Sequence, residues 1–594
     1  MTSTRVFYQA GSAVALTLGM LAGCNSIVGL DKIEVVDAPT ETAGAGSTGG
    51  RMNTSGGAAG DSSGGGTSGD ANGPNGGTGD VAETQGGDGG APDLDECQTN
   101  QQCTDQFSKD AVGEGGSAPG VVAGACIKKP HGHCVQLLSE DCDTITGDYT
   151  DDNAIFIGSL FSTKGPTAAT NLPRQQSAAL GVEEINSKGG VPGGETSADG
   201  RPLVMISCDE STNLVRAATH LVSDLQVPAI VGPNTSQDTL DVSTKVTVKG
   251  GTVVMSPTGV ASSIADLSDN DLTWLMVPSD VQRAPLMIDQ INTLEAEIKA
   301  ADTTKTTVKL GVIYRDDALG QGTRAALSSL MINGQPLSAT VNQKAVQIDP
   351  YNGADANQNA IVTKYTTTFL PDIIVLAGTA EAITKVMQPI EAAWLGATPP
   401  ASPPPQYILI DSTKVPELIT AVTGNDSLRT RVRGTGITPG PSGPNTPAET
   451  FTQFQQNYAG RYPNSSTTIS GMGPAHDAAF AIGLALGATR TQEVSGASVA
   501  QGLRKLAGGA TMVETTPENV LRAMQKLGAG EKVSAIGTFG MLDWDDNGAV
   551  QGGTLEIWCI GSSGGKPTYN SSGLTFDIMT QKKSGTYMAC PVTQ

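Results

Sequence analysis

Short apolar runs alternate with amphipathic helical patterns along most of the chain after residue 153. Apolar runs occupy 154–158, 203–206, 229–232 and 252–255, and polar residues typical of loops follow them. Between the runs, apolar residues recur at helical spacing, most clearly over 214–225. Strands that alternate with helices in this way predict a parallel α/β sheet.

The same alternation continues to about residue 560. Further strands are predicted at 274–277, 308–314, 373–377, 407–410 and 432–437, and further helices at 281–300, 320–331, 379–395, 448–459 and 474–488. The repeated strand and helix units span more residues than a single domain usually contains, so two similar lobes are predicted. Because ligands bind such sheets at the carboxyl ends of the strands, we expect the site at the loops 164–166, 232–236 and 256–259.

The first residues of the chain have the features of a bacterial export signal. Arg5 is the only charge before an apolar region over 11–21, which is too short for a permanent membrane span. A Leu-Ala-Gly-Cys sequence ending at Cys24 resembles a lipobox, so we expect a signal peptide over 1–23 and lipidation of the cysteine. Asn25 then points to the outer membrane of the cell envelope, on its periplasmic or surface face. The alternative is an ordinary signal peptide with a chance cysteine.

Composition changes between about residues 40 and 92, where Gly, Ser, Thr, Ala, Asn and Asp dominate. Such a segment cannot bury enough apolar surface to become ordered, so residues 24–92 are predicted to be a lipid anchor and a disordered tether. The whole chain has a formal net charge of −23. This acidity disfavours nucleic acid and anionic membrane surfaces as partners of the folded part.

Cysteines other than Cys24 number eight (9 − 1). An even number in an exported chain predicts disulfides, although spacing alone does not choose their pairing. The candidates are Cys97, Cys103, Cys126, Cys134, Cys142, Cys208, Cys559 and Cys590. Those within 93–142 define a small cysteine-rich module; Cys559 is expected to pair with Cys590, and Cys208 with the module. No metal site is predicted, because a disulfide-bonded cysteine cannot ligate.

Several motifs that are weak alone occur in a specific order. They are Ile157-Gly158 with Gly165-Pro166, 182–186 with Gly189-Gly190, 230–233, 255–257, 312–322 and 475–479. In this order they resemble the type I periplasmic binding proteins, specifically the leucine/isoleucine/valine-binding family. That family serves branched-chain amino-acid ABC transporters and also forms receptor ectodomains.

The resemblance covers 153–560 and implies a fold of two doubly wound parallel-sheet lobes that close on a ligand by hinge motion. One lobe is expected at about 153–281 plus 437–548, and the other at about 282–436 plus 549–594. The disordered tether and the cysteine-rich module precede them.

The resemblance also implies which residues face the ligand. They are Lys164, Thr235, Ser236, Thr258, Gly259, Leu319, Thr379 and Asp411. Ser236 matches a hydroxyl that holds the ligand carboxylate in the family, and Asp411 lies near an acid that often pairs with the ligand ammonium. The pattern departs from the family at Val260, where a threonine is expected, and at Leu319, where a tyrosine is expected. The alternative is that these loop residues only cap helices.

Together these patterns predict a lipid-anchored solute-binding protein. It would clamp a small polar ligand, an amino acid or a related carboxylate, for uptake by an ABC permease. The alternatives are a surface sensor or receptor with the same clamp, and a structural lipoprotein whose cleft binds nothing; the long tether and the cysteine module favour them. An enzyme is not expected, because no nucleophile, metal or phosphate-binding motif is present, and no cofactor is implied.

Overall fold

The computed structural model describes residues 96–594 except 111–120, 130, 194–199, 397–402, 490–492, 591 and 594. The predicted signal peptide, the lipidation site Cys24 and the tether lie outside these residues. The chain divides into a unit at Met1–Gly87 and a unit at Asp88–Gln594, and all described residues belong to the second. Within them, no helix combines the length and the apolar composition that a membrane span requires.

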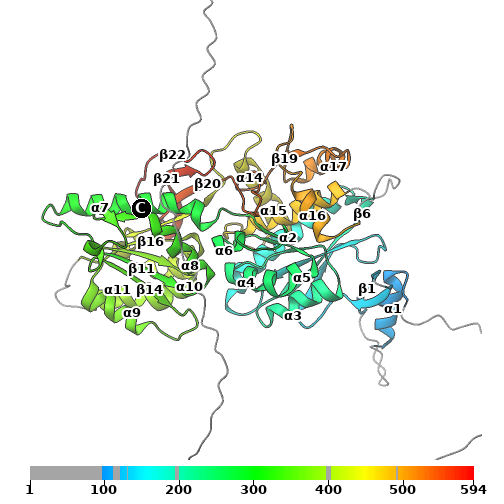
Figure 1. The fold of residues 1–594 in the computed structure, drawn as a ribbon, viewed down its shortest axis with the longest axis horizontal. Coiled ribbons are helices and arrows are strands. Elements are labelled where there is room, and N and C mark those ends of the chain that lie inside the picture. Colours follow the sequence, from blue (N-terminus) through cyan, green and yellow to red (C-terminus); the bar gives the residue numbers. More distant parts are fainter. Residues whose placement is uncertain are drawn as a thin grey trace, which may run out of the picture. The chain divides into compact units, whose positions relative to one another are not determined.

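A six-stranded sheet organises the first lobe of the described chain (Figure 1). Its order is β10-β9-β8-β4-β7-β3, and neighbouring strands are parallel except β7 with β3. The strands are β3 (Cys142–Thr146), β4 (Ile155–Phe161), β7 (Leu203–Asp209), β8 (Ala229–Val231), β9 (Val253–Ser256) and β10 (Thr273–Leu275). The helices of this lobe include α4 (Ser236–Val242), α6 (Ser262–Ala265), α14 (Pro447–Arg461), α16 (Gly496–Leu503) and α17 (Val520–Gly528).

Alternate residues of β7 face two separate apolar cores. Met205 packs with α2 (Ala168–Asn186) and α15 (Met472–Thr489), whereas Ile206 packs with α3 (Leu214–Thr219). Because successive side chains of a strand point in opposite directions, helices cover both faces of the sheet. Burial on both faces explains why the central strands are unbroken apolar runs in the sequence.

A nine-stranded sheet organises the second lobe. Its order is β14-β11-β15-β16-β17-β20-β21-β22, with β23 paired to β20. The strands are β11 (Leu310–Arg315), β14 (Val346–Tyr351), β15 (Ile373–Ala377), β16 (Gln406–Leu409), β17 (Val432–Thr438), β20 (Thr554–Ser563), β21 (Lys566–Asp577), β22 (Lys582–Ser584) and β23 (Val592–Thr593). The helices of this lobe include α7 (Asp280–Ala301), α8 (Ala318–Ala326), α9 (Asn359–Thr363), α11 (Gln388–Gly396) and α12 (Pro416–Val422).

The chain crosses between the two sheets more than once. It leaves the first sheet after β10, returns to the first lobe through α14 and α15 after β17, and reaches the second sheet again at β20. The strands from β14 to β17 are parallel, and β20 to β22 continue the sheet antiparallel. Two parallel-sheet lobes built from interleaved segments confirm the predicted fold class.

The cysteine-rich segment forms a small module. Helix α1 (Asn100–Asp110) lies beside the antiparallel strands β1 (Gly124–Ile127) and β2 (His133–Gln136). Two disulfides cross-link it, Cys97–Cys126 and Cys103–Cys134, with S–S distances of 2.08 and 2.05 Å. Such bonds stabilise a unit too small for a large apolar core.

Two further disulfides confirm the pairings expected from the sequence. Cys142 bonds Cys208 (S–S 1.98 Å), and Cys559 bonds Cys590 (1.91 Å). The first of them joins Cys142, the last residue of the predicted module and the first of β3, to β7 of the same six-stranded sheet. Leu137 of the module also packs in the apolar core behind that strand, so the module and the first lobe share a core as well as a covalent bond.

The predicted helix at 320–331 is wrong only in its last two residues. Helix α8 ends at Ala326 and continues as the 3-10 helix η4 (Leu327–Ser329), and β12 (Met331–Ile332) then pairs with β13 (Gln335–Pro336). Asn333 and Gly334 between these strands have φ values of 53° and 72°, as a tight hairpin turn requires. The Asn-Gly turn therefore overrides the helical spacing before it.

Candidate functional site

Ser236 joins the two loops that follow β8 and β9 in the first lobe. It is the first residue of α4 and is 2% exposed. Its Oγ accepts hydrogen bonds from the backbone N–H groups of Val260 (3.0 Å) and Ala261 (3.2 Å). The hydroxyl oxygen that the sequence assigns to a ligand therefore holds the neighbouring loop in place.

The other predicted residues of these loops are also bonded within the loops. Thr258 Oγ1 donates to the backbone oxygen (2.5 Å) and to Oδ1 (2.8 Å) of Asn234, and Gly259 N donates within its own loop (3.0 Å). Thr235 caps α4, because its Oγ1 accepts from Asp238 N at 3.1 Å. The predicted ligand residues of these two loops are thus hydrogen-bonded to the loops themselves.

Lys164 and Thr379 lie apart from the hydrogen-bonded residues of the loops after β8 and β9. Lys164 Nζ lies 3.1 Å from Asp143 Oδ2, and its side chain is half-exposed. Thr379 belongs to the second lobe, where its hydroxyl donates to Glu381 and accepts from Arg315 Nη1 at 3.0 Å. Both side chains are engaged in local ionic groups, away from the residues that line the cavity between the lobes.

A small cavity lies where the loop after β9 meets α7, α8 and the 3-10 turn η8 (Asp411–Thr413). Its volume of about 10 Å³ is enough for about one water molecule. Val260 and Leu319 line it and belong to one apolar cluster, so the two lobes are in contact there. Of the predicted ligand residues, the structure brings Leu319 and Asp411 to this cavity, and Ser236 is bonded to the backbone of Val260 behind it.

The charged residues of the cavity are Asp280, Arg283 and Asp411. Arg283 Nη1 donates to Asp411 Oδ2 at 2.5 Å, and Arg283 Nε donates to Pro278 O at 2.7 Å. Asp280 is only 6% exposed, and its Oδ2 is buried without a hydrogen-bond partner. Burial, opposed by the nearby charge of Arg283, raises the pKa of Asp280 to about 8.

Asp280 is the functional candidate that the sequence interpretation missed. It is the first residue of α7, directly after the capping residue Ser279, and helix N-termini ordinarily carry acidic residues. The sequence does place Asp280 three residues before Arg283, and residues three apart lie on the same face of a helix. This spacing could have indicated a charged pair at the site. Gly322 of α8 leaves room for the carboxyl group, since a Cβ there would lie 2.2 Å from Asp280 Oδ2.

A second buried ionic cluster lies among the helices of the first lobe. His476 of α15 is fully buried; its Nε2 is 2.8 Å from Glu184 Oε2, and its Nδ1 is 3.6 Å from Asp477 Oδ1. Asn457 donates to Glu184 Oε1 (2.7 Å), and Thr538 donates to Asp477 Oδ2 through both its N–H (2.7 Å) and its hydroxyl (2.6 Å). Burial alone would lower the pKa of His476, but the two carboxylates outweigh it and raise the pKa to about 9.

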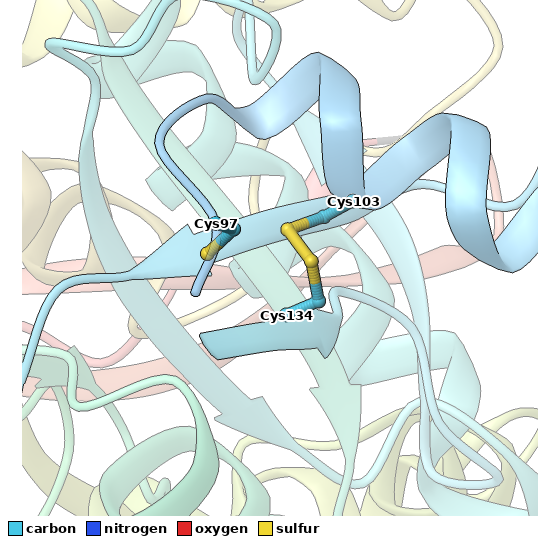
Figure 2. A group of neighbouring side chains, drawn as sticks. All are labelled: Cys97, Cys103 and Cys134. Atoms are coloured by element: carbon cyan, nitrogen blue, oxygen red, sulfur yellow. A yellow bond between two sulfur atoms is a disulfide. The ribbon is translucent and has the colours of Figure 1, made fainter. Parts of the chain in front are cut away.

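Three sulfur atoms of the cysteine module lie close enough together for a metal ion. The Sγ atoms of Cys97, Cys103 and Cys134 are within 4.8 Å of one another, and Figure 2 shows the bond between the last two. Each of these atoms belongs to a disulfide, whereas metal binding requires thiolates. In this oxidised form the group cross-links the module and offers no metal ligand.

The described chain thus consists of two parallel-sheet lobes that meet at a small charged cavity. Residues 154–363 match a family model described as periplasmic binding protein. This stretch is similar to that family, and the two parallel-sheet lobes have the fold class that the motifs predicted.

Solved structures with similarity to the chain include amino-acid-binding proteins. LivJ from Streptococcus pneumoniae, a branched-chain amino acid transporter substrate-binding protein in complex with isoleucine, is 18% identical with a TM-score of 0.49, covering 70% of this chain and 99% of its own. The leucine-binding protein LivK from Thermotoga maritima is 15% identical with a TM-score of 0.49, covering 70% and 98%. A solute-binding protein from R. palustris in complex with benzoate is 12% identical with a TM-score of 0.48, covering 74% and 99%. Comparison with curated protein sequences gave no match.

Proposed function

We propose that this chain is a solute-binding protein of the cell envelope that closes its two lobes on a small ligand and delivers it to an ABC-type permease. The family match and the two-lobed fold support this proposal. The ligand would lie between the loops after β8 and β9 and the charged residues of α7 and η8. Anchorage by a lipid on Cys24 is part of the proposal, supported by the lipobox-like sequence before it.

The observation that carries the proposal is Oδ2 of Asp280, which is buried between the lobes without a hydrogen-bond partner. A polar group that is buried without a hydrogen bond costs roughly 1–3 kcal/mol of folding free energy, and perturbed acids of this kind concentrate at functional sites. This one lies at a cavity to which both lobes contribute residues. A ligand held there by lobe closure would supply the missing partner.

Thermal unfolding of the full-length protein, purified in detergent, tests the proposal. The panel comprises amino acids, small carboxylates, amides, amines and sugars. A ligand at 100 times its Kd should add about 2.7 kcal/mol to the free energy of unfolding and raise Tm accordingly. The absence of a rise with every member of the panel would overturn the proposal.

Two matched variants locate the binding site. Asp280→Asn should abolish the rise in Tm that the ligand causes. Asp289→Asn should retain it, because Asp289 lies on the same helix but forms a more exposed ion pair with Lys583 (2.6 Å). Equal ligand responses in the two variants would place the ligand elsewhere.

A non-transporting surface protein is the second candidate, because the cavity is already nearly filled. Val260 and Leu319 pack together at the cavity of about 10 Å³. In a protein that binds no ligand, this apolar contact would keep the two lobes closed permanently. Small-angle scattering distinguishes the candidates: a solute-binding protein should change its radius of gyration when ligand is added, whereas an unchanging radius throughout the panel favours the structural role.

Lipid anchorage is tested in cells. Cys24→Ser should move the protein from the membrane fraction to the soluble fraction, because the acyl chains would have no attachment site. Ser26→Ala, two residues further on, should leave it with the membrane. Retention of the Cys24→Ser protein in the membrane fraction would contradict anchorage at this residue.

A further inference from the structure

We infer that the ligand of this cleft is a small organic cation, such as a primary amine, that carries no carboxylate group. This inference rests on the proposed function and specifies the class of its ligand. The cavity is lined by two carboxyl groups, Asp280 and Asp411, and one guanidinium group, Arg283. Arg283 is bonded to Asp411, while an oxygen of Asp280 has no partner. When Asp280 is ionised, the set contains one carboxylate without a counter-ion, and a cation would complete it.

The opposite wall of the cleft is poorly suited to a carboxylate. The backbone N–H groups of Val260 and Ala261 both donate to Ser236 Oγ, and the Thr258 hydroxyl donates to Asn234. Helix α4 is only seven residues long and is capped by its own threonine, so it offers no additional anion site. A ligand carboxylate would have to break these bonds, whereas a ligand without one leaves them intact.

Charged and polar side chains from each element around Asp280 influence the pKa of its carboxyl group, and therefore whether it can pair with a cation. Arg283 lies on its own helix, Asp411 on η8, and Thr323 on α8, and the pKa of Asp280 is sensitive to each of them. Arg174 of the first lobe is attracted to Asp411, but its guanidinium is bonded to other first-lobe groups (2.7 and 2.8 Å). With its pKa near 8, Asp280 holds a proton at pH 7. A bound cation would replace that proton, and about one proton would be released per ligand.

The rest of the lining limits the body of the ligand. Val260, Ala284, Met287 and Leu319 contribute apolar surface to the cavity. Hydroxyl groups on the ligand would be buried there without partners, at a cost in free energy. The lobes would separate to admit a ligand, because the closed cavity of about 10 Å³ holds only about one water molecule. The ligand class is then a cation on a short hydrocarbon group, rather than a sugar or a polyol.

Isothermal titration of the full-length protein with three matched probes tests the ligand class. Isoamylamine, 4-methylpentanoate and L-leucine share a hydrocarbon group but carry a cation, an anion and both. The amine should bind at least tenfold more tightly than leucine, and 4-methylpentanoate should give no binding. Equal or tighter binding of either carboxylate would overturn the inference.

The same test separates this inference from the function on which it rests. If none of the three probes binds while another compound of the panel raises Tm, the class of that compound decides the outcome. If that compound is a cation without a carboxylate, the inference stands. If it is of any other class, the inference is overturned but the proposed function is not. If no compound of any class binds, both the proposed function and the inference are overturned.

The pH dependence of amine binding gives an independent measurement. Because a proton must leave Asp280, Kd for isoamylamine should fall about tenfold per pH unit from pH 6 to pH 8 and level off above. Asp280→Asn should weaken binding at least tenfold and abolish this dependence, while Asp289→Asn should resemble the unaltered protein. A Kd for the unaltered protein that does not change with pH would overturn the inference, whatever the variants do.

Discussion

Two of the buried ionic clusters in the described part of the chain differ in how their carboxylates are partnered. In the first lobe, His476 lies between Glu184 and Asp477, whose oxygens accept further hydrogen bonds from neighbouring side chains. At the cavity, Arg283 is bonded to Asp411, and an oxygen of Asp280 is left without a partner. Buried charge is costly unless it is paired. His476 Nδ1 makes no hydrogen bond, but its ring lies between two carboxylates of opposite charge. Asp280 Oδ2 has no such partner, and the proposed ligand would supply it.

The largest expected effect comes from removing the cation at the cavity. Arg283→Met keeps an extended side chain but leaves the mostly buried carboxylate of Asp411 without its counter-ion, so the free energy of unfolding should fall by about 4 kcal/mol. Urea unfolding at pH 7 measures the change. Lys583→Met, which breaks the more exposed pair with Asp289, is the control and should cost about 0–1 kcal/mol. Similar small losses in both variants would contradict the importance of the buried cation.

Raising the pH should weaken the first cluster. The pKa of His476 is about 9 in the folded protein and about 6.5 in an unfolded chain. Its stabilisation is therefore complete below pH 6.5 and is lost as the pH rises through 9, a change of about 3 kcal/mol. Urea unfolding between pH 6 and pH 9.5 measures it, and His476→Gln, which cannot titrate, should lose this component. Parallel pH profiles for the two proteins would refute it.

The same acid-to-amide substitution should have opposite signs in the two clusters. The pKa of Asp280 is raised to about 8, so this acid reduces stability progressively as the pH rises from about 4 to 8. Asp280→Asn removes that cost and should stabilise the protein by up to about 4 kcal/mol at pH 7. Asp477→Asn should destabilise it by about 2 kcal/mol, because an amide nitrogen cannot accept from Thr538. Thermal unfolding of both variants measures the two changes in stability. If both substitutions stabilise the protein, or both destabilise it, the two clusters do not differ as described.

The smallest effect is expected at an exposed pair beside the first cluster. Arg461 of α14 donates to Glu183 of α2 at 2.7 and 2.9 Å, next to the buried Glu184. Because water and salt screen this pair, Arg461→Met should cost at most about 1 kcal/mol. The cost should shrink further in 1 M salt. A loss comparable to that of Arg283→Met in urea unfolding would show that burial does not distinguish these ion pairs.

Strands buried on both faces could be predicted from their apolar runs. The run at 373–377 coincides with β15, and the run at 407–410 is displaced by one residue from β16. The edge strand β14 was not predicted, because only its last residue is buried and it contains Pro350. Edge strands alternate between solvent and protein, so they lack the continuous apolar signal of central strands.

The site could be predicted only in part, because its chemistry depends on contacts between distant segments. The loops at the carboxyl ends of the strands were identifiable from the general behaviour of parallel sheets. The role of Ser236 was not, since its Oγ accepts from the next loop, which no local pattern encodes. The environment of the Asp280 carboxyl group likewise depends on residues distant in the sequence. Gly322 leaves space for it, and burial together with the charge of Asp411 raises its pKa. Lipid anchorage and delivery to a permease stay predictions.

The disulfide between β3 and β7 also determines how the first lobe bears mechanical load. Cys142 is the first residue of β3, so tension from the N-terminal side of the chain reaches it before the rest of the strand. It is paired with Cys208 across the antiparallel register and bonded to it covalently. Peeling β3 away from that end would require breaking a covalent bond rather than successive hydrogen bonds. The lobe can therefore be pulled through its N-terminal connection without its sheet opening at this edge.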